Sequence, residues 1–138
     1  MRIAPPEAPR TGYLYGKGIY FATMAGKSAP YCCPELSNNI GLFLLCEVAV
    51  GKSRKIYGTD HNADLNLPKD CNSTMCVGYT TPDPKDTKTI NKDILVPFGK
   101  AGPNKDKSAQ RTHDEIIVYN TNQAKIRYMC MVKFGSYQ

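Results

Sequence analysis

Residues 40–50, IGLFLLCEVAV, form the longest apolar run of the 138-residue chain. A nearly continuous apolar run with polar residues on both sides predicts a strand that is buried on both faces. Gly41 and Glu47 interrupt the run, and it is much shorter than the roughly 20 residues that a membrane-spanning helix needs. We therefore place this strand in the protein core and expect no membrane-spanning segment.

The C-terminal segment, residues 125–134, shows a different pattern, because apolar and basic side chains alternate along it. Such alternation predicts a half-buried strand with one apolar and one solvated face. The apolar positions are Ile126, Tyr128, Cys130, Val132 and Phe134, and the basic positions are Lys125, Arg127 and Lys133. Residues 115–119 predict a further short strand.

The other segments contain little helical pattern. Residues 1–12 are rich in proline and glycine and should form an extended surface loop. Residues 13–22 predict a short strand, and residues 23–31 predict a helix. Residues 51–112 are mostly polar, with short apolar islands that predict brief strands at 55–57, 75–79 and 94–98.

Together these elements predict one α+β domain over residues 1–138. Strands dominate it, and no long amphipathic helix separates them, so antiparallel or mixed sheets are expected rather than βαβ units. The composition, with 41% hydrophobic and 22% charged residues, fits a single globular domain.

The chain is basic, with 18 Lys and Arg residues against 12 Asp and Glu residues and a formal net charge of +6. This excess favours anionic partners such as nucleic acid, phosphorylated cofactors or acidic protein surfaces. The basic residues are spread along the chain rather than gathered in one block. Charge alone therefore leaves both a nucleotide pocket and a nucleic-acid-binding surface open.

The chain contains six cysteines, and an even number in a small domain raises the possibility of disulfides. Cys46 and Cys130 lie in apolar runs, as buried free thiols often do, and Cys32 and Cys33 form a vicinal pair that rarely closes on itself. Residues 1–9 lack the apolar region of a secretory signal peptide. We therefore expect reduced thiols in an intracellular compartment.

The spacing of potential ligands predicts no metal site. Zinc sites pair their ligands at short spacings such as C-x2–4-C. Cys71 and Cys76, with four residues between them, reach the upper limit of this spacing, but no second close pair accompanies them, because His61 and His113 are far apart in the sequence. Metal-dependent chemistry is therefore not expected.

Four sequence motifs resemble a known family. They are RIAPPEAPRTGYLYGKGIYFATMAGKSAPY at 2–31, IGLFLLCEVAVG at 40–51, TTPDP at 80–84 and DEIIVY at 114–119. In this order they resemble the catalytic domain of the poly(ADP-ribose) polymerases, closest to the DNA-dependent nuclear members, and the resemblance covers nearly the whole chain. Residues 2–31 are similar to the family's donor loop and nicotinamide pocket.

The resemblance implies the ADP-ribosyltransferase fold. The family has an H-G-[ST] motif in a strand upstream of the donor loop, and neither His61 nor His113 lies in such a motif. We therefore expect the N-terminal part of the fold to be missing and the chain alone to be inactive. Core strands that lack their neighbours recruit partners, so poor solubility or dimerisation is expected of the isolated chain.

The resemblance also implies roles for individual residues. Glu115 matches the catalytic glutamate, and Tyr20 belongs to the same catalytic set. Tyr20 and Tyr31 would stack on the two faces of nicotinamide, and the other cofactor-binding positions are Arg2, Gly12, Tyr13, Lys27 and Ser28. From the residues alone, core packing remains open for the tyrosines. Solvated surface positions remain open for the lysine and the serine, and an ordinary strand-end carboxylate for Glu115.

The implied activity is transfer of ADP-ribose from NAD, as co-substrate, to protein acceptors and growing chains. The reaction breaks the bond between ribose and nicotinamide through an oxocarbenium-like transition state, which a nearby carboxylate stabilises. The resemblance further implies a nuclear location, a role in DNA repair, and contact with DNA only through modules outside this chain. The alternative is an inactive fragment that binds NAD, ADP-ribose or a partner protein.

Overall fold

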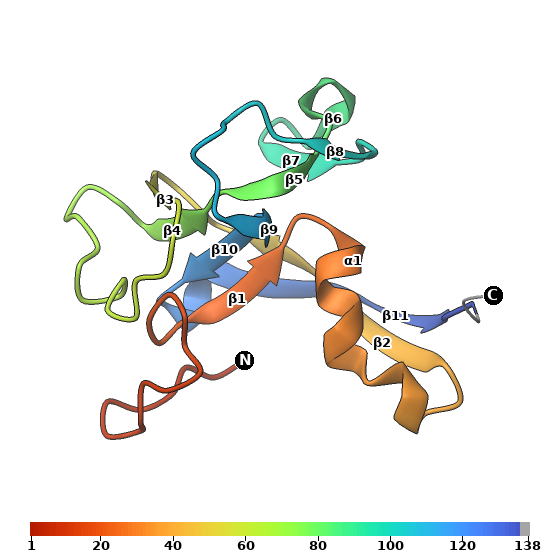
Figure 1. Ribbon diagram of the computed structural model, residues 1–138, viewed down its shortest axis with the longest axis horizontal. Coiled ribbons are helices and arrows are strands. Elements are labelled where there is room, and N and C mark those ends of the chain that lie inside the picture. Colours follow the sequence, from red (N-terminus) through yellow and green to blue (C-terminus); the bar gives the residue numbers. More distant parts are fainter. Residues whose placement is uncertain (136–138) are drawn as a thin grey trace.

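The computed structural model describes residues 1–135, which form short strands joined by turns (Figure 1). The strands are β1 (Ile19–Ala22), β2 (Ile40–Val48), β3 (Ser53–Ile56), β4 (Ser73–Cys76), β5 (Gly78–Pro82), β6 (Thr87–Ile90), β7 (Ile94–Pro97), β8 (Ala101–Pro103), β9 (Arg111–His113), β10 (Glu115–Val118) and β11 (Ala124–Lys133). The helical elements are α1 (Ala25–Ser28) and the 3₁₀ turns η1 (Ala29–Cys32), η2 (Pro34–Leu36), η3 (Pro84–Asp86) and η4 (Thr121–Gln123).

A four-stranded sheet in the order β1-β10-β4-β3 forms the centre of the molecule. β10 pairs antiparallel with β1 and β4, whereas β3 and β4 are parallel. The core is built on one face of this sheet from Tyr15, Ala63, Cys76 and Ile117, all of which are fully buried. The two smaller sheets are β8-β5-β9 and β6-β7. β6, β7 and β8 lie together at one end of the molecule, whereas β9 lies next to β10 (Figure 1).

β2 and β11 form a separate antiparallel ribbon that projects from the body (Figure 1). Leu44 pairs with Met129, and the next pair, Leu45 with Tyr128, points to the other face. All four side chains are exposed, at 51% and 68% in the first pair and 56% and 66% in the second. The predictions that residues 40–50 are buried on both faces and that residues 125–134 are half-buried are therefore wrong, because neither face of these pairs is covered by another layer.

The predicted strand at residues 13–22 is shorter in the structure, where β1 covers only its last four residues. Gly16 adopts a left-handed φ of +79° and turns the chain before the strand begins. The predicted helix at residues 23–31 consists of one α-helical turn followed by the 3₁₀ turn η1. Pro30 has no backbone N–H to continue an α-helix, so the α-helical hydrogen bonds end there.

The observed fold confirms the predicted class, which is α+β with many strands in mixed and antiparallel sheets and little helix. The short strands predicted at 55–57, 75–79, 94–98 and 115–119 are all present within one to three residues. In residues 1–135, no helix has both the length and the apolar composition required to span a membrane.

Candidate active site

Glu115 begins β10, in the middle of the central sheet. It is opposite Ala22 of β1 on one side and Cys76 of β4 on the other, and only 8% of its surface is exposed. Its carboxylate Oε1 lies 3.2 Å from Nζ of Lys27 on α1. The fold thus places a nearly buried carboxylate directly beside one cation.

Tyr20 lies on the same face of the sheet as Glu115, because it is two positions away from the β1 residue opposite Glu115. Its hydroxyl donates to the carbonyl of Gly16 over 2.7 Å and accepts from the backbone N–H of Tyr15 over 3.0 Å. Burial is the main cause that raises the pKa of Tyr20 to about 12. Tyr20 is therefore a neutral phenol near pH 7 whose hydroxyl holds the turn before β1.

Lys27, Ser28 and Tyr31 come from α1 and η1, next to each other in space. Nζ of Lys27 lies 5.8 Å from the ring centroid of Tyr31, a distance at which the cation is attracted to the ring. Lys27 therefore connects Tyr31 to Glu115. Tyr31 is 77% exposed, so its ring is open to solvent, and Ser28 is half-buried at the end of α1.

Arg2, Gly12 and Tyr13 lie on the segment before β1 rather than on the elements that hold Glu115. Arg2 is exposed and forms no ion pair within the described part of the chain. Gly12 has a φ of +91°, which favours glycine. The carbonyl oxygen of Tyr13 lies 2.9 Å from Nδ1 of His61. The structure therefore assembles the predicted residues as two groups, one around Glu115 and one on this segment.

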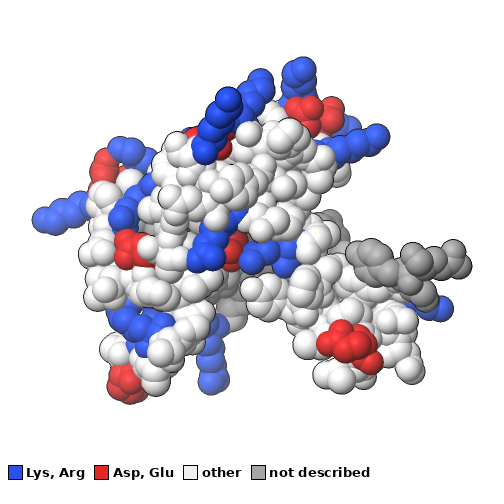
Figure 2. All heavy atoms as spheres, in the orientation of Figure 1, with Lys and Arg blue, Asp and Glu red and all other residues white. Residues whose placement is uncertain are grey.

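A cavity of about 260 Å³ opens beside Glu115. Its lining residues are Leu14, Lys27, Arg111, Thr112, His113 and Glu115. Figure 2 shows a small acidic area flanked by basic side chains near the centre of the visible face. Two basic side chains and a histidine around one carboxylate make the cavity suitable for part of an anionic ligand.

Arg111 and His113 line this cavity but were not predicted as site residues from the sequence. Both precede Glu115 at alternate positions, and alternate residues of an extended chain share one face. The pattern R-T-H-D-E at 111–115 could therefore have placed them beside the glutamate.

Asp114 points away from Glu115, to the other side of the chain, where it is hydrogen-bonded to β5. It is 2% exposed, and its carboxylate accepts from the backbone N–H of Gly78 over 2.8 Å and from Oγ1 of Thr81 over 2.6 Å. These bonds hold β5 against the start of β10. The position of Glu115 therefore depends on its neighbour.

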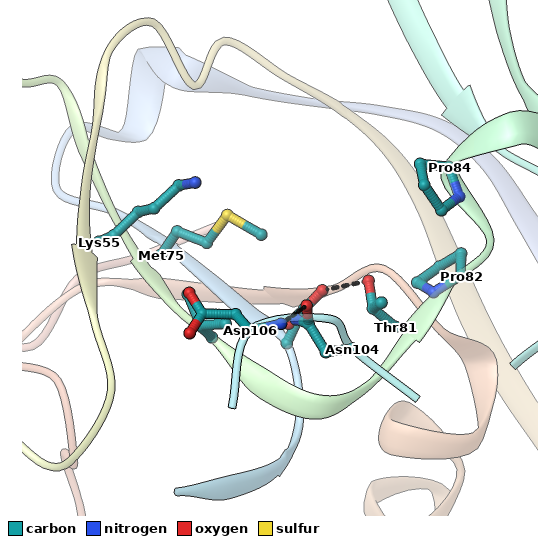
Figure 3. Close-up of a pocket in the computed structure, with 9 residues that line it drawn as sticks. Lys55, Met75, Thr81, Pro82, Pro84, Asn104 and Asp106 are labelled. Carbon is teal, nitrogen blue, oxygen red and sulfur yellow. Dashed lines mark hydrogen bonds between the residues drawn. The ribbon is translucent and has the colours of Figure 1, made fainter. Parts of the chain in front are cut away.

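A second cavity, of about 240 Å³, adjoins Asp114 (Figure 3). Met75 and Lys55 line one side of it, and Thr81 and Pro82 line another. Met75 pairs with the residue after Glu115, so this cavity is on the opposite face of the central sheet from Glu115. It is thus separate from the candidate active site, and its buried carboxylate is already occupied by protein donors.

The sequence can be compared with those of known proteins. A profile of the "Poly(ADP-ribose) polymerase catalytic domain" matches residues 1–134. The chain belongs to the poly(ADP-ribose) polymerase family. It is 47% identical to "Poly [ADP-ribose] polymerase 2" of Arabidopsis thaliana over 98% of the chain and 21% of that relative. It is 39% identical to "Poly [ADP-ribose] polymerase 1" of Danio rerio over 98% of the chain and 13% of that relative. The chain thus spans about a fifth or less of the length of these relatives.

Membership of the polymerase family confirms the resemblance on which the sequence analysis relied. The two motifs that implied most of the site residues fall on elements that meet in the structure, since residues 2–31 include β1, α1 and most of η1, and residues 114–119 include β10. In the described range, 1–135, no group of three or more His, Cys, Asp or Glu side chains could hold a metal ion.

Proposed function

We propose that this chain is part of an NAD-dependent ADP-ribosyltransferase of the polymerase type. It would transfer ADP-ribose from NAD to protein acceptors and growing ADP-ribose chains, with release of nicotinamide. The observation that carries the proposal is the nearly buried Glu115 carboxylate, paired with Lys27 at 3.2 Å and lining a cavity, in a chain of this family.

The chemistry requires a negative charge near the reacting ribose. The bond between C1′ and the nicotinamide nitrogen breaks, nicotinamide leaves with the bonding electrons, and an acceptor oxygen attacks C1′. The developing positive charge on the ribose is stabilised by a carboxylate fixed in a site with little water. Glu115 has this character, and it can also accept the proton or hydrogen bond of an acceptor hydroxyl.

The residues around Glu115 fit the reacting end of NAD. The exposed Tyr31 offers an aromatic face for the cationic nicotinamide ring. Stacking and the quadrupole of the tyrosine ring both attract such a cation. The cavity of about 260 Å³ is smaller than the roughly 300–1,000 Å³ typical of drug-sized ligands. It therefore accommodates part of NAD, while Arg2, Gly12 and Tyr13 would lie along the adenosine end.

The wider setting is proposed from the family. The whole protein would act in the nucleus in DNA repair, and DNA would be contacted by modules outside this chain. The basic side chains on the visible face are spread over several elements in Figure 2, which gives no single patch that favours direct DNA binding by this chain.

NAD turnover, measured as nicotinamide release, tests the proposal in two samples. One is the chain as given, and the other is the chain extended upstream through an H-G-[ST] segment. Each is compared with its Glu115→Gln variant and with Glu47→Gln, which makes the same change in the β2–β11 ribbon. We expect turnover in the extended protein, a loss of about 10²-fold or more in Glu115→Gln, and no loss in Glu47→Gln.

Other outcomes separate the two candidate functions. NAD binding without nicotinamide release in either sample supports the alternative, a catalytically inactive module that recognises NAD or ADP-ribose. Turnover that is unchanged in Glu115→Gln would overturn the role of this carboxylate.

A further inference from the structure

The segment before β1 is held in place by a loop that is distant in sequence. Both terminal nitrogens of Arg10 donate to the two carboxylate oxygens of Asp64, over 2.7 and 3.1 Å. Nη1 of Arg10 also donates to the carbonyl of His61 over 3.2 Å. A bidentate guanidinium–carboxylate pair fixes orientation as well as distance, so this contact sets how the segment lies.

The loop that carries Asp64 is anchored to the body. Ala63 is fully buried in the core cluster that contains Tyr15. Asp60 accepts from Arg54 over 2.9 Å and from the backbone N–H of Asn62 over 3.0 Å. The loop is therefore a fixed support for the segment before β1.

Three further contacts join the loop to the segment. The backbone N–H of Asp60 donates to the carbonyl of Leu14 over 3.1 Å, and Nδ1 of His61 lies 2.9 Å from the carbonyl oxygen of Tyr13. At Gly16, an added Cβ would lie 2.3 Å from Oδ1 of Asp64. The chain must therefore have glycine there for the carboxylate to approach so closely.

The charges of the pair support each other. Burial acts to raise the pKa of Asp64, but the hydrogen bonds and the charge of Arg10 outweigh it and lower the pKa below its ordinary value. The side chains of Arg10 and Asp64 are 31% and 15% exposed. The pair is thus ionised near pH 7 and partly shielded from solvent.

Lys17 holds the other end of the same segment. This lysine is 5% exposed, and its Nζ donates to the carbonyls of Pro5 and Pro6, each over 2.6 Å. The prolines lie between Arg2 and Gly12, two of the residues predicted to bind NAD. The contacts made by Lys17 and by Arg10 together fix the path of the chain between Arg2 and Gly12.

We infer that Arg10 and Asp64 are a positioning pair, which holds residues 2–13 ready for the adenosine end of NAD without touching the ligand. This inference rests on the proposed function, since it assigns a purpose to the segment only if the chain binds NAD. Preorganisation raises affinity because the ordering of the segment does not have to accompany binding. Nicotinamide alone would not depend on the pair, because Tyr20, Ser28 and Tyr31 are on other elements.

Binding of two probes, NAD and free nicotinamide, tests the inference in the full 138-residue chain by calorimetry. The variants are Arg10→Gln, Asp64→Asn and the double variant, with Lys52→Gln and Asp70→Asn as matched controls because they disrupt an exposed ion pair elsewhere. Hydrogen exchange of the amides of residues 2–13 is measured without ligand.

We expect each single variant to weaken NAD binding by about five- to tenfold. The double variant should weaken it no more than either single variant does. Nicotinamide binding should be unchanged, exchange in residues 2–13 should accelerate, and the controls should match the unmodified chain. Three results would overturn the inference but not the proposed function. They are an equal loss of affinity for NAD and for nicotinamide, an unchanged affinity for NAD, and unchanged hydrogen exchange in residues 2–13. Failure of the unmodified chain to bind NAD overturns the inference, whereas failure of the extended protein to release nicotinamide overturns the proposed function and the inference with it.

Discussion

Nζ of Lys27 and Oε1 of Glu115 lie 3.2 Å apart and join α1 to the central strand β10. The two side chains are 26% and 11% exposed, so the pair is shielded from solvent more than most surface ion pairs. Because Glu115 is nearly buried, loss of its cation leaves a poorly solvated charge. This contact therefore serves both the position of α1 and the candidate active site.

A double-mutant cycle measures the strength of this ion pair. We expect Lys27→Met and Glu115→Gln each to lower the free energy of unfolding by about 1–2 kcal/mol, with a coupling energy of about 1 kcal/mol. Urea unfolding of the four proteins gives these values. The exposed pair Lys52–Asp70 is the control, and its coupling should remain below about 0.5 kcal/mol. Equal coupling in the two pairs would contradict the expectation.

The buried Asp114 should contribute more to the free energy of unfolding than an exposed aspartate does. Its replacement by alanine leaves the buried N–H of Gly78 and the hydroxyl of Thr81 without their acceptor, so we expect a loss of about 2–4 kcal/mol. Asp114→Asn keeps an acceptor oxygen and should lose less. Asp86→Ala, at an exposed position in η3, should change the unfolding free energy by less than about 0.5 kcal/mol. Similar urea midpoints for the two alanine variants would show that the Asp114 contacts contribute little.

The prediction of the fold from the sequence succeeded where the signal was local. Short apolar islands predicted β4, β7 and β10, because turn residues on either side mark where such strands end. The prediction of burial failed at Leu44 and Tyr128, since apolar periodicity reports what a strand can bury and not whether a covering layer is present. The same limit applies to the length of β1, which depends on a left-handed turn at Gly16.

The candidate site could be predicted only in part, for a related reason. The motifs at 114–119 and 2–31 singled out Glu115 and Lys27 separately, and the structure shows that the two side chains form an ion pair. The support provided by Arg10 and Asp64 could not be predicted, because an ion pair between a loop and a distant segment leaves no pattern in the sequence around either residue. Long-range polar contacts of this kind are seen only once the chain is folded.

Two half-buried tyrosines, Tyr20 and Tyr119, should make the folded state less stable in strong base. Burial is the main cause that raises the pKa of Tyr20 and of Tyr119 to about 12, against an ordinary value near 10. In the unfolded chain both phenols lose their protons from about pH 10, whereas the folded chain retains them. The stability that they contribute is therefore complete below about pH 10 and is lost as the pH rises toward 12, by up to about 1.4 kcal/mol per pH unit for each tyrosine.

The Tyr119→Phe variant isolates this effect from the titration of the lysines. Its unfolding free energy should fall less steeply between about pH 10 and 12 than that of the unmodified chain, as followed by urea unfolding and phenolate absorbance. Tyr128→Phe changes a tyrosine that is 66% exposed and should leave the slope unaltered. Parallel slopes for the unmodified chain and the Tyr119 variant would rule out the buried phenol as a source of the pH dependence.

The uncovered ribbon of β2 and β11 should make the isolated chain associate. Leu44 and Leu45 with their partners Met129 and Tyr128 expose apolar surface on both faces, and contiguous patches of this kind promote contact between molecules. Sedimentation velocity over a range of concentrations should therefore show dimers or larger species. Leu44→Lys with Met129→Lys should shift the chain toward monomer, because a charge that enters an apolar contact must lose its hydration.

Leu65→Lys is the matched control, since Leu65 is 70% exposed outside the ribbon and its replacement should leave association unchanged. A chain that stays monomeric at all concentrations, or that associates equally in the ribbon variant and the control, would show that the ribbon is not the surface of contact.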